Sequence, residues 1–147
     1  MGFFAMMSIS ASALSAERQR AEITAANLAN AETTHTDSGG PYVRKEPVFG
    51  TASTSPFQTV LNRAGHFAQP PAGAVELTGV VDDPAPPVVR YEPGNPDADK
   101  DGYVSYPDIN PLTEMVDLMG ATRAYGLNSS AVQAEKGMVS ASLDILK

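Results

Sequence analysis

The chain has 147 residues, of which 42% are hydrophobic and 18% are charged, so its composition fits one ordinary domain or two small ones. A net charge of −7 argues against binding to nucleic acid or insertion into an anionic membrane. The absence of cysteine excludes disulfides, thiolate metal sites and cysteine nucleophiles.

Proline divides the chain into three parts, because all 12 prolines lie between Pro41 and Pro111. A proline inside a helix removes a hydrogen bond and clashes with the preceding turn. The two ends can therefore be helical, whereas the middle cannot form long helices. We expect a helix at 1–36, a β-rich module at 37–109 and a second helix at 110–147.

The first of these helices carries apolar residues at heptad spacing, which is typical of a coiled-coil seam. A second row of apolar residues, also seven apart, lies on another face, so this helix should have more than one neighbour. The first positive charge is Arg18, so the basic region of a secretory signal is missing and we expect no cleaved signal. The first row is Met7, Leu14, Ala21 and Leu28, and the second is Ile9, Ala16 and Ile23.

Two amides, Asn27 and Asn30, lie three residues apart among small apolar residues of this helix. One interpretation is a polar face near the helix end. The other is a pair of buried amides that fix the register between packed helices. The sequence leaves both open.

The middle of the chain contains short runs of β-branched and aromatic residues bounded by proline and glycine. The clearest are YVRKEPVF (42–49) and PPVVRYEP (86–93). Weaker candidates are FQTVL (57–61), HFA (66–68) and VELTGVV (75–81).

The acidic stretch DADKDGYVSYPD (97–108) resembles the start of a calcium-binding loop, with acidic residues at alternate positions before a glycine. However, the last ligand position holds Asp108 rather than a glutamate, Pro107 precedes it, and EPGNP (92–96) cannot form an incoming helix. We therefore favour an acidic turn followed by a strand at 103–106. A small calcium-binding adhesion or interaction module that uses the Asp97–Asp108 loop is the alternative function.

The second helix should begin at Asn110, as the N-cap, and Pro111. Its apolar row repeats every seven residues, and a second row interleaves at spacings of three and four. The first row is Leu118, Tyr125, Val132, Val139 and Leu146, and the second is Met115, Thr122, Ser129, Lys136 and Leu143.

The sequence gives little support for a catalytic function. His35 and His66 belong to no recognisable motif, and the acidic pair Asp82-Asp83 is more simply explained as part of a turn. We predict no enzyme, no catalytic, cofactor-binding or metal-binding residues, and no cofactor.

The expected fold class is α+β: long terminal helices pair as a coiled-coil-like inner domain, with a small, proline-rich β module inserted between them. Two such helices alone would leave much apolar surface uncovered, which normally marks an interaction surface. A membrane-active amphipathic helix is disfavoured by the acidity of the chain. We predict a subunit interface formed by Met7, Leu14, Ala21, Ile23, Asn27, Leu28, Asn30, Met115, Leu118, Tyr125, Val132, Val139 and Leu146.

Three motifs in order resemble the flagellar rod and hook family of axial proteins. SASALSAERQRAEITAANLANAETTHTDSGGPYVRKEPVF resembles the N-terminus of the family, with the signature LANAETT at 28–34, in which Ala31 and Glu32 are minor departures. EPGNPDADKDGYVSYPDIN resembles a stretch characteristic of a proximal rod member. PLTEMVDLMGATRAYGLNSSAVQAEKGM resembles the C-terminal helix of the family. The resemblance spans nearly the whole chain and is weakest at 50–88.

The resemblance implies a non-enzymatic structural subunit of the proximal rod of the bacterial flagellar basal body, without a metal requirement. Such a subunit would leave the cytoplasm through the flagellar type III export apparatus and polymerise helically in the periplasmic space. Its partners would be copies of itself, other rod proteins and the surrounding ring components, without nucleic acid or membrane insertion.

Overall fold

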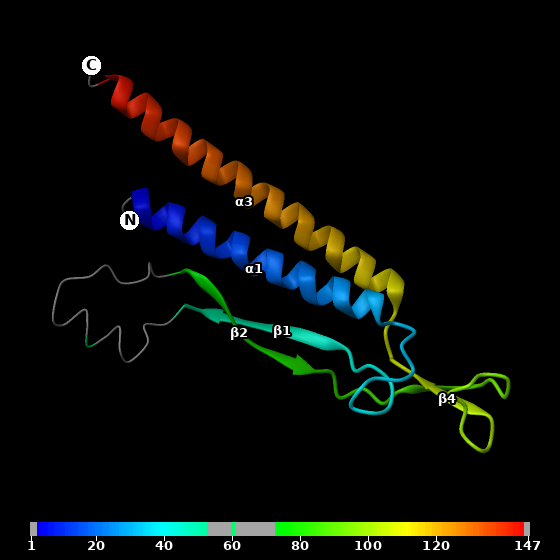
Figure 1. The fold of residues 1–147 in the computed structure, drawn as a ribbon. Coiled ribbons are helices and arrows are strands. Elements are labelled where there is room, and N and C mark those ends of the chain that lie inside the picture. Colours follow the sequence, from blue (N-terminus) through cyan, green and yellow to red (C-terminus); the bar gives the residue numbers. More distant parts are fainter. Residues whose placement is uncertain (1–2, 53–59, 61–72, 146–147) are drawn as a thin grey trace. The chain divides into compact units, whose positions relative to one another are not determined.

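A computed structural model describes residues 3–52, 60 and 73–145 (Figure 1). Two long helices enclose four strands in sequence, and the helices pack together, so the predicted α+β class is confirmed. The weaker strand candidates at 57–61, apart from residue 60, and at 66–68 lie outside the described residues. The elements are α1 (Phe3–Ala29), β1 (Lys45–Thr51), β2 (Val75–Asp82), β3 (Val88–Tyr91), β4 (Tyr103–Tyr106) and α3 (Pro111–Ile145).

Helix α3 begins where the sequence predicts. The Asn110 side chain accepts a hydrogen bond from the backbone N–H of Leu112 at 3.0 Å, and its carbonyl accepts the N–H of Glu114 at 3.1 Å. These are the bonds of an N-cap residue, and Pro111 supplies the preset φ of the first turn.

Helix α1 ends at Ala29, earlier than the predicted 36, although neither glycine nor proline stands there. The Asn30 side chain donates to the carbonyl of Ala26 at 2.8 Å, and the Asn30 N–H is shared between the carbonyls of Ala26 and Asn27. The next N–H, of Ala31, bonds to Leu28 three residues back. This tightening of the last turn is a common helix end, and apolar periodicity does not reveal it.

The strands form two separate two-stranded sheets, β1 with β2 and β3 with β4. Asp83 N–H bonds to the Arg44 carbonyl at one end of the first pair, and Ala52 N–H bonds to the Ala74 carbonyl at the other, so β1 and β2 run antiparallel. Strands β3 and β4 are also antiparallel, with Val88 opposite Tyr106 and Tyr91 opposite Tyr103.

The acidic stretch forms the connection of the β3–β4 hairpin, so the prediction of a turn followed by a strand is confirmed. Gly102 has a φ of 82°, which disfavours any residue with a Cβ. A Cβ there would also lie 3.0 Å from the Tyr91 ring and 3.2 Å from Pro93. The turn therefore requires glycine both for its conformation and for close packing.

The described chain divides into two compact units, and each contains part of both helices. The first comprises Met1–Gln19, Phe49–Thr78 and Ala121–Lys147, and the second comprises Arg20–Val48 and Gly79–Gly120. In the second unit the contacts of α1 with α3 run from Arg20–Asp117 to Asn27–Glu114, so these segments are antiparallel. The division by composition into 1–36, 37–109 and 110–147 stays a prediction.

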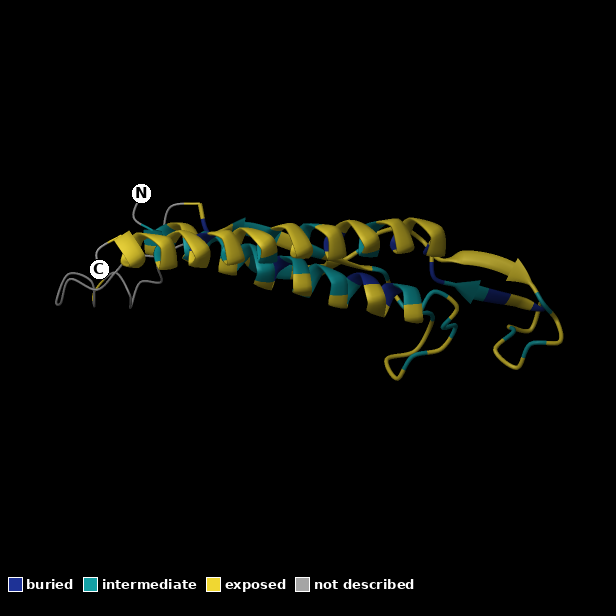
Figure 2. Cartoon of the chain, turned by 90° about the horizontal axis from the view of Figure 1, so that it is seen from above, coloured by how far each residue is buried: buried dark blue, intermediate teal, exposed yellow. Residues whose placement is uncertain are grey.

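Among the described residues, few large apolar ones are buried in either unit. Figure 2 colours each described residue by its burial. The buried residues include Ala16, Ala74, Ala121 and Glu135 in the first unit, and Thr24, Asn27, Val104, Ile109 and Glu114 in the second. Small and polar side chains therefore occupy much of the helix interface, while many large apolar side chains remain at the surface.

Candidate functional site

Asn27 joins three elements of the second unit through its side chain, which is 1% exposed. Its Nδ2 donates to the Lys45 carbonyl at 2.9 Å and to the Glu114 carboxylate at 3.3 Å. Its Oδ1 accepts the Lys45 N–H at 2.9 Å and the Tyr42 hydroxyl at 3.1 Å. Two donors and two acceptor sites are all used, which is the full capacity of an amide.

This geometry supports the register interpretation for Asn27, since the amide bonds across the helix pair. Asn30 behaves differently, because it bonds within its own helix end to Ala26 and Thr33. For Asn30, the interpretation as a local polar residue near the helix end holds.

Glu114 is the charged centre of the same network and is 2% exposed. Its carboxylate accepts a hydrogen bond from Arg44 Nε at 2.7 Å, in addition to the one from the Asn27 amide. Arg44 Nη1 also reaches Asp83 at 3.5 Å and contacts Glu46. A buried carboxylate is stable only when paired and hydrogen-bonded, and both conditions are met. We call Asn27, Arg44 and Glu114 the polar lock.

The electrostatics of the polar lock favour a permanently charged Arg44. Burial opposes the charge, but the hydrogen bonds to Glu114 and Glu46 and their negative charges outweigh it and raise the pKa of Arg44. Burial, followed by the charges of Asp82 and Glu114, raises the pKa of the neighbouring Tyr42, so its hydroxyl stays protonated and can donate to Asn27.

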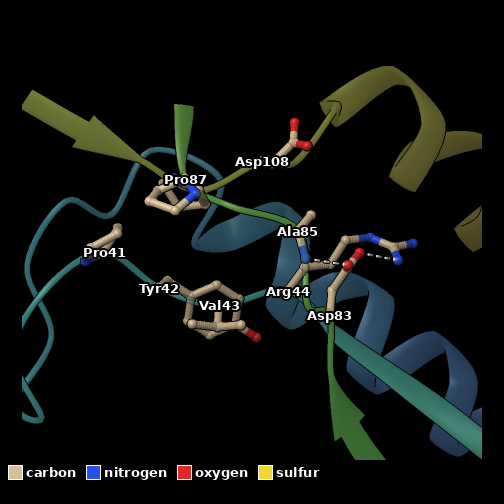
Figure 3. A pocket seen from close by; sticks show the side chains of 9 residues that line it. Pro41, Tyr42, Val43, Arg44, Asp83, Ala85, Pro87 and Asp108 are labelled. Carbon is tan, nitrogen blue, oxygen red and sulfur yellow. Dashed lines mark hydrogen bonds and ion pairs between the residues drawn. The ribbon is translucent and has the colours of Figure 1, made fainter. Parts of the chain in front are cut away.

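Beside Arg44 lies a small hollow of about 40 Å³, lined in part by three prolines (Figure 3). Arg44 and Asp83 meet at its edge, and Asp83 also accepts the backbone N–H of Ala85 at 2.9 Å. A space of this size holds about one water molecule. The hollow is therefore too small to enclose a substrate. Its lining is Pro41, Tyr42, Val43, Arg44, Asp83, Ala85, Pro87, Pro107 and Asp108.

Sequence analysis assigned no role in helix packing to Glu114 or Glu135, and both are buried. They belong to one row with Ala121, at intervals of seven, which interleaves with the Leu118, Val132 and Val139 row. Glu135 accepts the Ser10 hydroxyl at 3.2 Å in the first unit, and its other carboxylate oxygen is buried without a hydrogen-bond partner. Heptad spacing could have revealed this row, but two of its members, Glu114 and Glu135, are acidic.

The predicted subunit-interface residues fall into three groups in this structure. Asn27 is buried, whereas Met115 and Tyr125 are exposed by 48% and 44%. Leu146 lies outside the described residues. Their role in contacts between subunits stays a prediction. The half-buried group is Met7, Leu14, Ala21, Ile23, Leu28, Asn30, Leu118, Val132 and Val139.

Two apolar surfaces stand out on the helices. One, which we call the ridge, lies in the first turns of α3 and consists of Leu112, Met115, Val116 and Met119, with exposures between 48% and 70%. The outer side of α3 is coloured as exposed in Figure 2. The other, which we call the end groove, has a volume of about 470 Å³ and is lined by Phe3, Phe4, Met7, Lys136, Val139, Ser140 and Leu143.

The acidic loop uses its carboxylates to hold the turn. Asp99 Oδ1 accepts the backbone N–H groups of Asp101 at 2.9 Å and Tyr103 at 2.8 Å, and Asp97 accepts the Thr34 hydroxyl at 2.6 Å. Within the described ranges, no group of three histidine or acidic side chains is arranged to hold a metal ion.

Glu92, which directly follows β3, also stabilises the hairpin. Its carboxylate accepts hydrogen bonds from the Tyr106 hydroxyl at 2.8 Å and from the Asn95 amide at 3.2 Å. The hydrogen bond from Tyr106, followed by that from Asn95, lowers the pKa of Glu92. The same bond to Glu92 raises the pKa of Tyr106.

Neither helix, over the residues described, has the length and hydropathy of a transmembrane span. Comparison with family models matches residues 7–34 to the flagella basal body rod protein model, and residues 100–145 to the C-terminal model of the flagellar basal body rod FlgEFG proteins.

Full-length relatives carry the name flagellar basal-body rod protein FlgC. The chain is 36% identical to the FlgC of Bacillus subtilis, with all of both chains covered. It is 32% identical to that of Borreliella burgdorferi over 100% of this chain and 99% of the relative. For Salmonella typhimurium the identity is 34%, over 95% and 94% of the two chains. The expected rod resemblance is confirmed, and the chain belongs to the FlgC family of flagellar basal-body rod structural proteins.

Proposed function

We propose that this rod-family chain builds the proximal rod of the flagellum by helical polymerisation with copies of itself and other rod proteins. The resulting shaft would transmit torque across the periplasmic space. Heterologous contacts that do not close generate such helical filaments.

The observation that carries the proposal is the apolar surface left uncovered on α1 and α3. Phe4 is 82% exposed on α1, and Leu112, Met119 and Leu127 are each more than 60% exposed on α3. Large apolar side chains left exposed in this way favour contacts with other protein surfaces. In a family of rod proteins, the natural occupants are neighbouring rod subunits.

The polar lock supports the same function in a different way. A shaft needs subunits whose helices keep a fixed register under load, and a buried polar residue at a helix seam specifies register. Asn27 and Glu114 connect α1, β1 and α3 by direct bonds, so a shift of one helix by a turn would leave a buried carboxylate unpaired.

We further propose that the chain is exported by the flagellar type III apparatus without cleavage of a signal, and that the finished rod is surrounded by the basal-body rings. The absence of cysteine supports this location, since free thiols would crosslink in an oxidising compartment. The proposal is tested by deleting the gene in its own host, expressing a tagged copy and isolating basal bodies. The tagged chain should copurify with the rod and restore motility. Complete, motile flagella in the deletion strain would contradict the proposal.

A further inference from the structure

We propose that one face of the β3–β4 hairpin is a docking surface for a positively charged segment of a different protein. We call it the hairpin face, and it consists of Val89, Tyr91 and Tyr103, with the acidic loop 92–101 beside it. The inference identifies a partner by its charge, and it rests on the proposed function because that partner is sought in the assembled basal body.

The two faces of the hairpin differ in exposure. Side chains alternate along a strand, and Tyr91 lies opposite Tyr103, so these two share a face with Val89. Their exposures are 65%, 46% and 57%, whereas Val104 on the other face is 1% exposed. Strand β3 is coloured as exposed along its whole length in Figure 2. The described residues therefore leave the hairpin face, which is apolar and aromatic, open to a partner.

The hairpin face is held in shape by contacts within the hairpin. The rings of Tyr91 and Tyr103 lie 5.3 Å apart at an angle of 63°, the edge-to-face arrangement that aromatic pairs favour. Gly102 leaves the space that the Tyr91 ring occupies, since a Cβ there would lie 3.0 Å from it. An aromatic surface that is already ordered loses little conformational entropy on binding, and tyrosine is enriched in protein interfaces.

The loop beside the hairpin face is acidic. Residues 92–101 contain four acidic side chains and one lysine. Asp99 lies directly next to Tyr103, whose backbone N–H its Oδ1 accepts at 2.8 Å. Among the described residues, Asp97, Asp99 and Asp101 form no ion pair, so their charges are not neutralised within this part of the chain.

An aromatic face next to unneutralised carboxylates fits a segment that carries lysine or arginine among apolar residues. The carboxylates would pair with the cation, and a guanidinium also stacks on tyrosine rings. The opposite face of the hairpin contains such a contact, because the guanidinium carbon of Arg90 lies 4.8 Å from the centre of the Tyr106 ring.

The charge of the chain argues for a different protein rather than a second copy as the partner. The net charge is −7, so two copies repel each other at long range. Arg20 and Arg44 are also engaged by carboxylates of their own chain. Nucleic acid and an anionic membrane would be repelled by the same acidic loop.

The test places a photocrosslinking side chain, p-benzoylphenylalanine, in place of Val89, in a chain expressed in its own host instead of the native gene. Cells are irradiated, basal bodies are isolated, and the crosslinked peptide is identified by mass spectrometry. We expect an adduct with a different protein, through a peptide with more lysine and arginine than acidic residues. The matched control carries the same side chain in place of Val88, on the opposite face of β3, and should not give this adduct.

Charge reversal separates electrostatic attraction from mere proximity. The Asp101 side chain is exposed and makes no hydrogen bond with the described residues, so Asp101→Lys should leave the hairpin folded. It should lower the adduct yield, measured per chain incorporated in basal bodies, by about tenfold, because an attraction becomes a repulsion. Asp144→Lys changes the net charge equally at a point about 50 Å along α3 from its start, and should leave the yield unchanged.

An adduct with a second copy, with lipid or with an acidic peptide would overturn the inference. So would an equal adduct from position 88, or an unchanged yield in the Asp101→Lys chain. If chains with the crosslinker at position 89 enter basal bodies but give no adduct, the docking surface is wrong and the proposed function stands. Absence of the native chain from isolated basal bodies would refute the proposed function instead.

Discussion

Replacing Arg44 with methionine should destabilise the second unit by about 3 kcal/mol. Methionine preserves most of the length of the side chain, but it leaves Glu114, which is 2% exposed, without its cationic partner. Removing one partner of a buried ion pair costs about 3–5 kcal/mol. We take the lower end, because Asn27 would still donate to the Glu114 carboxylate.

A double-mutant cycle separates the energy of the Arg44–Glu114 ion pair from the energy of packing the aliphatic parts of the two side chains. Glu114→Met alone should cost about 1–2 kcal/mol, since Arg44 is 22% exposed and retains Asp83 and Glu46 as partners. The double variant Arg44→Met/Glu114→Met should cost no more than Arg44→Met alone, which corresponds to a coupling energy of about 1–2 kcal/mol.

Urea unfolding of the full chain, followed by far-ultraviolet circular dichroism, measures these differences. The matched control is Arg20→Met, which breaks the ion pair of Arg20 with Asp117 at 3.9 Å, where both side chains are about two-fifths exposed. That change should cost less than about 1 kcal/mol. Equal effects of Arg44→Met and Arg20→Met, or an additive cycle, would refute the assignment of Glu114 as a buried, paired charge.

Three further outcomes are expected. Leu28→Asp and Val132→Asp each place a charge in the predicted seam, so both chains should still be secreted but should be missing from isolated rods; normal incorporation of both would contradict the seam. Gly102→Ala should destabilise the β3–β4 hairpin by about 1–2 kcal/mol, because its φ of 82° is left-handed; an unchanged urea midpoint would argue against this strain. The hydrogen bond of Tyr106 to Glu92 lowers the pKa of Glu92, so its contribution to stability should be present above the ordinary value of 4.5 and lost as pH falls through the folded value. Since the same bond raises the pKa of Tyr106, the stability that Tyr106 contributes should be present below pH 10.0 and be lost as pH rises through the folded pKa of Tyr106. Tyr106→Phe should abolish this alkaline dependence and weaken the acid dependence of Glu92, to which Asn95 still donates; a pH profile identical to that of the parent chain would count against both.

Much of this fold could be predicted, because local chemistry determines it. The absence of proline outside the middle of the chain indicates the two helices, and Asn110 with Pro111 gives the start of α3. Runs of valine and tyrosine bounded by proline predict β1 and β3. Strand β2, which pairs with β1, was one of the weaker candidates, and β4, which pairs with β3, is the strand predicted after the acidic turn.

The polar lock was only partly predictable. Asn27 drew attention as an amide among small residues, but its partner on α3 could not be identified from the sequence. In the sequence, Glu114 is explained by its place in the first turn of α3, where an acidic side chain interacts favourably with the helix dipole. Because this local role is a sufficient explanation, the sequence does not indicate that Glu114 is buried. Glu114 lies 70 residues from Arg44 and 87 residues from Asn27, so only the packing of α3 against α1 and the segment before β1 brings the three residues together.

The end of α1 shows a second limit. The sequence predicts a helix up to residue 36, yet α1 ends at Ala29, where the side chain of Asn30 closes the last turn by bonding back to Ala26. Competition of this kind between a side chain and the backbone depends on local geometry rather than on hydrophobic pattern. The same limit explains why the polar row of α3 was missed: a search for apolar spacing passes over Glu114 and Glu135.

The central claim is that the helices expose apolar surface because other rod subunits cover it. A cryo-electron microscopy reconstruction of native basal bodies, with this chain traced, measures that directly. The account predicts that α1 and α3 lie inside the rod and that Leu112, Met119 and Phe4 are buried against neighbouring subunits. A rod in which these side chains face solvent, or in which the chain does not occur, would contradict it.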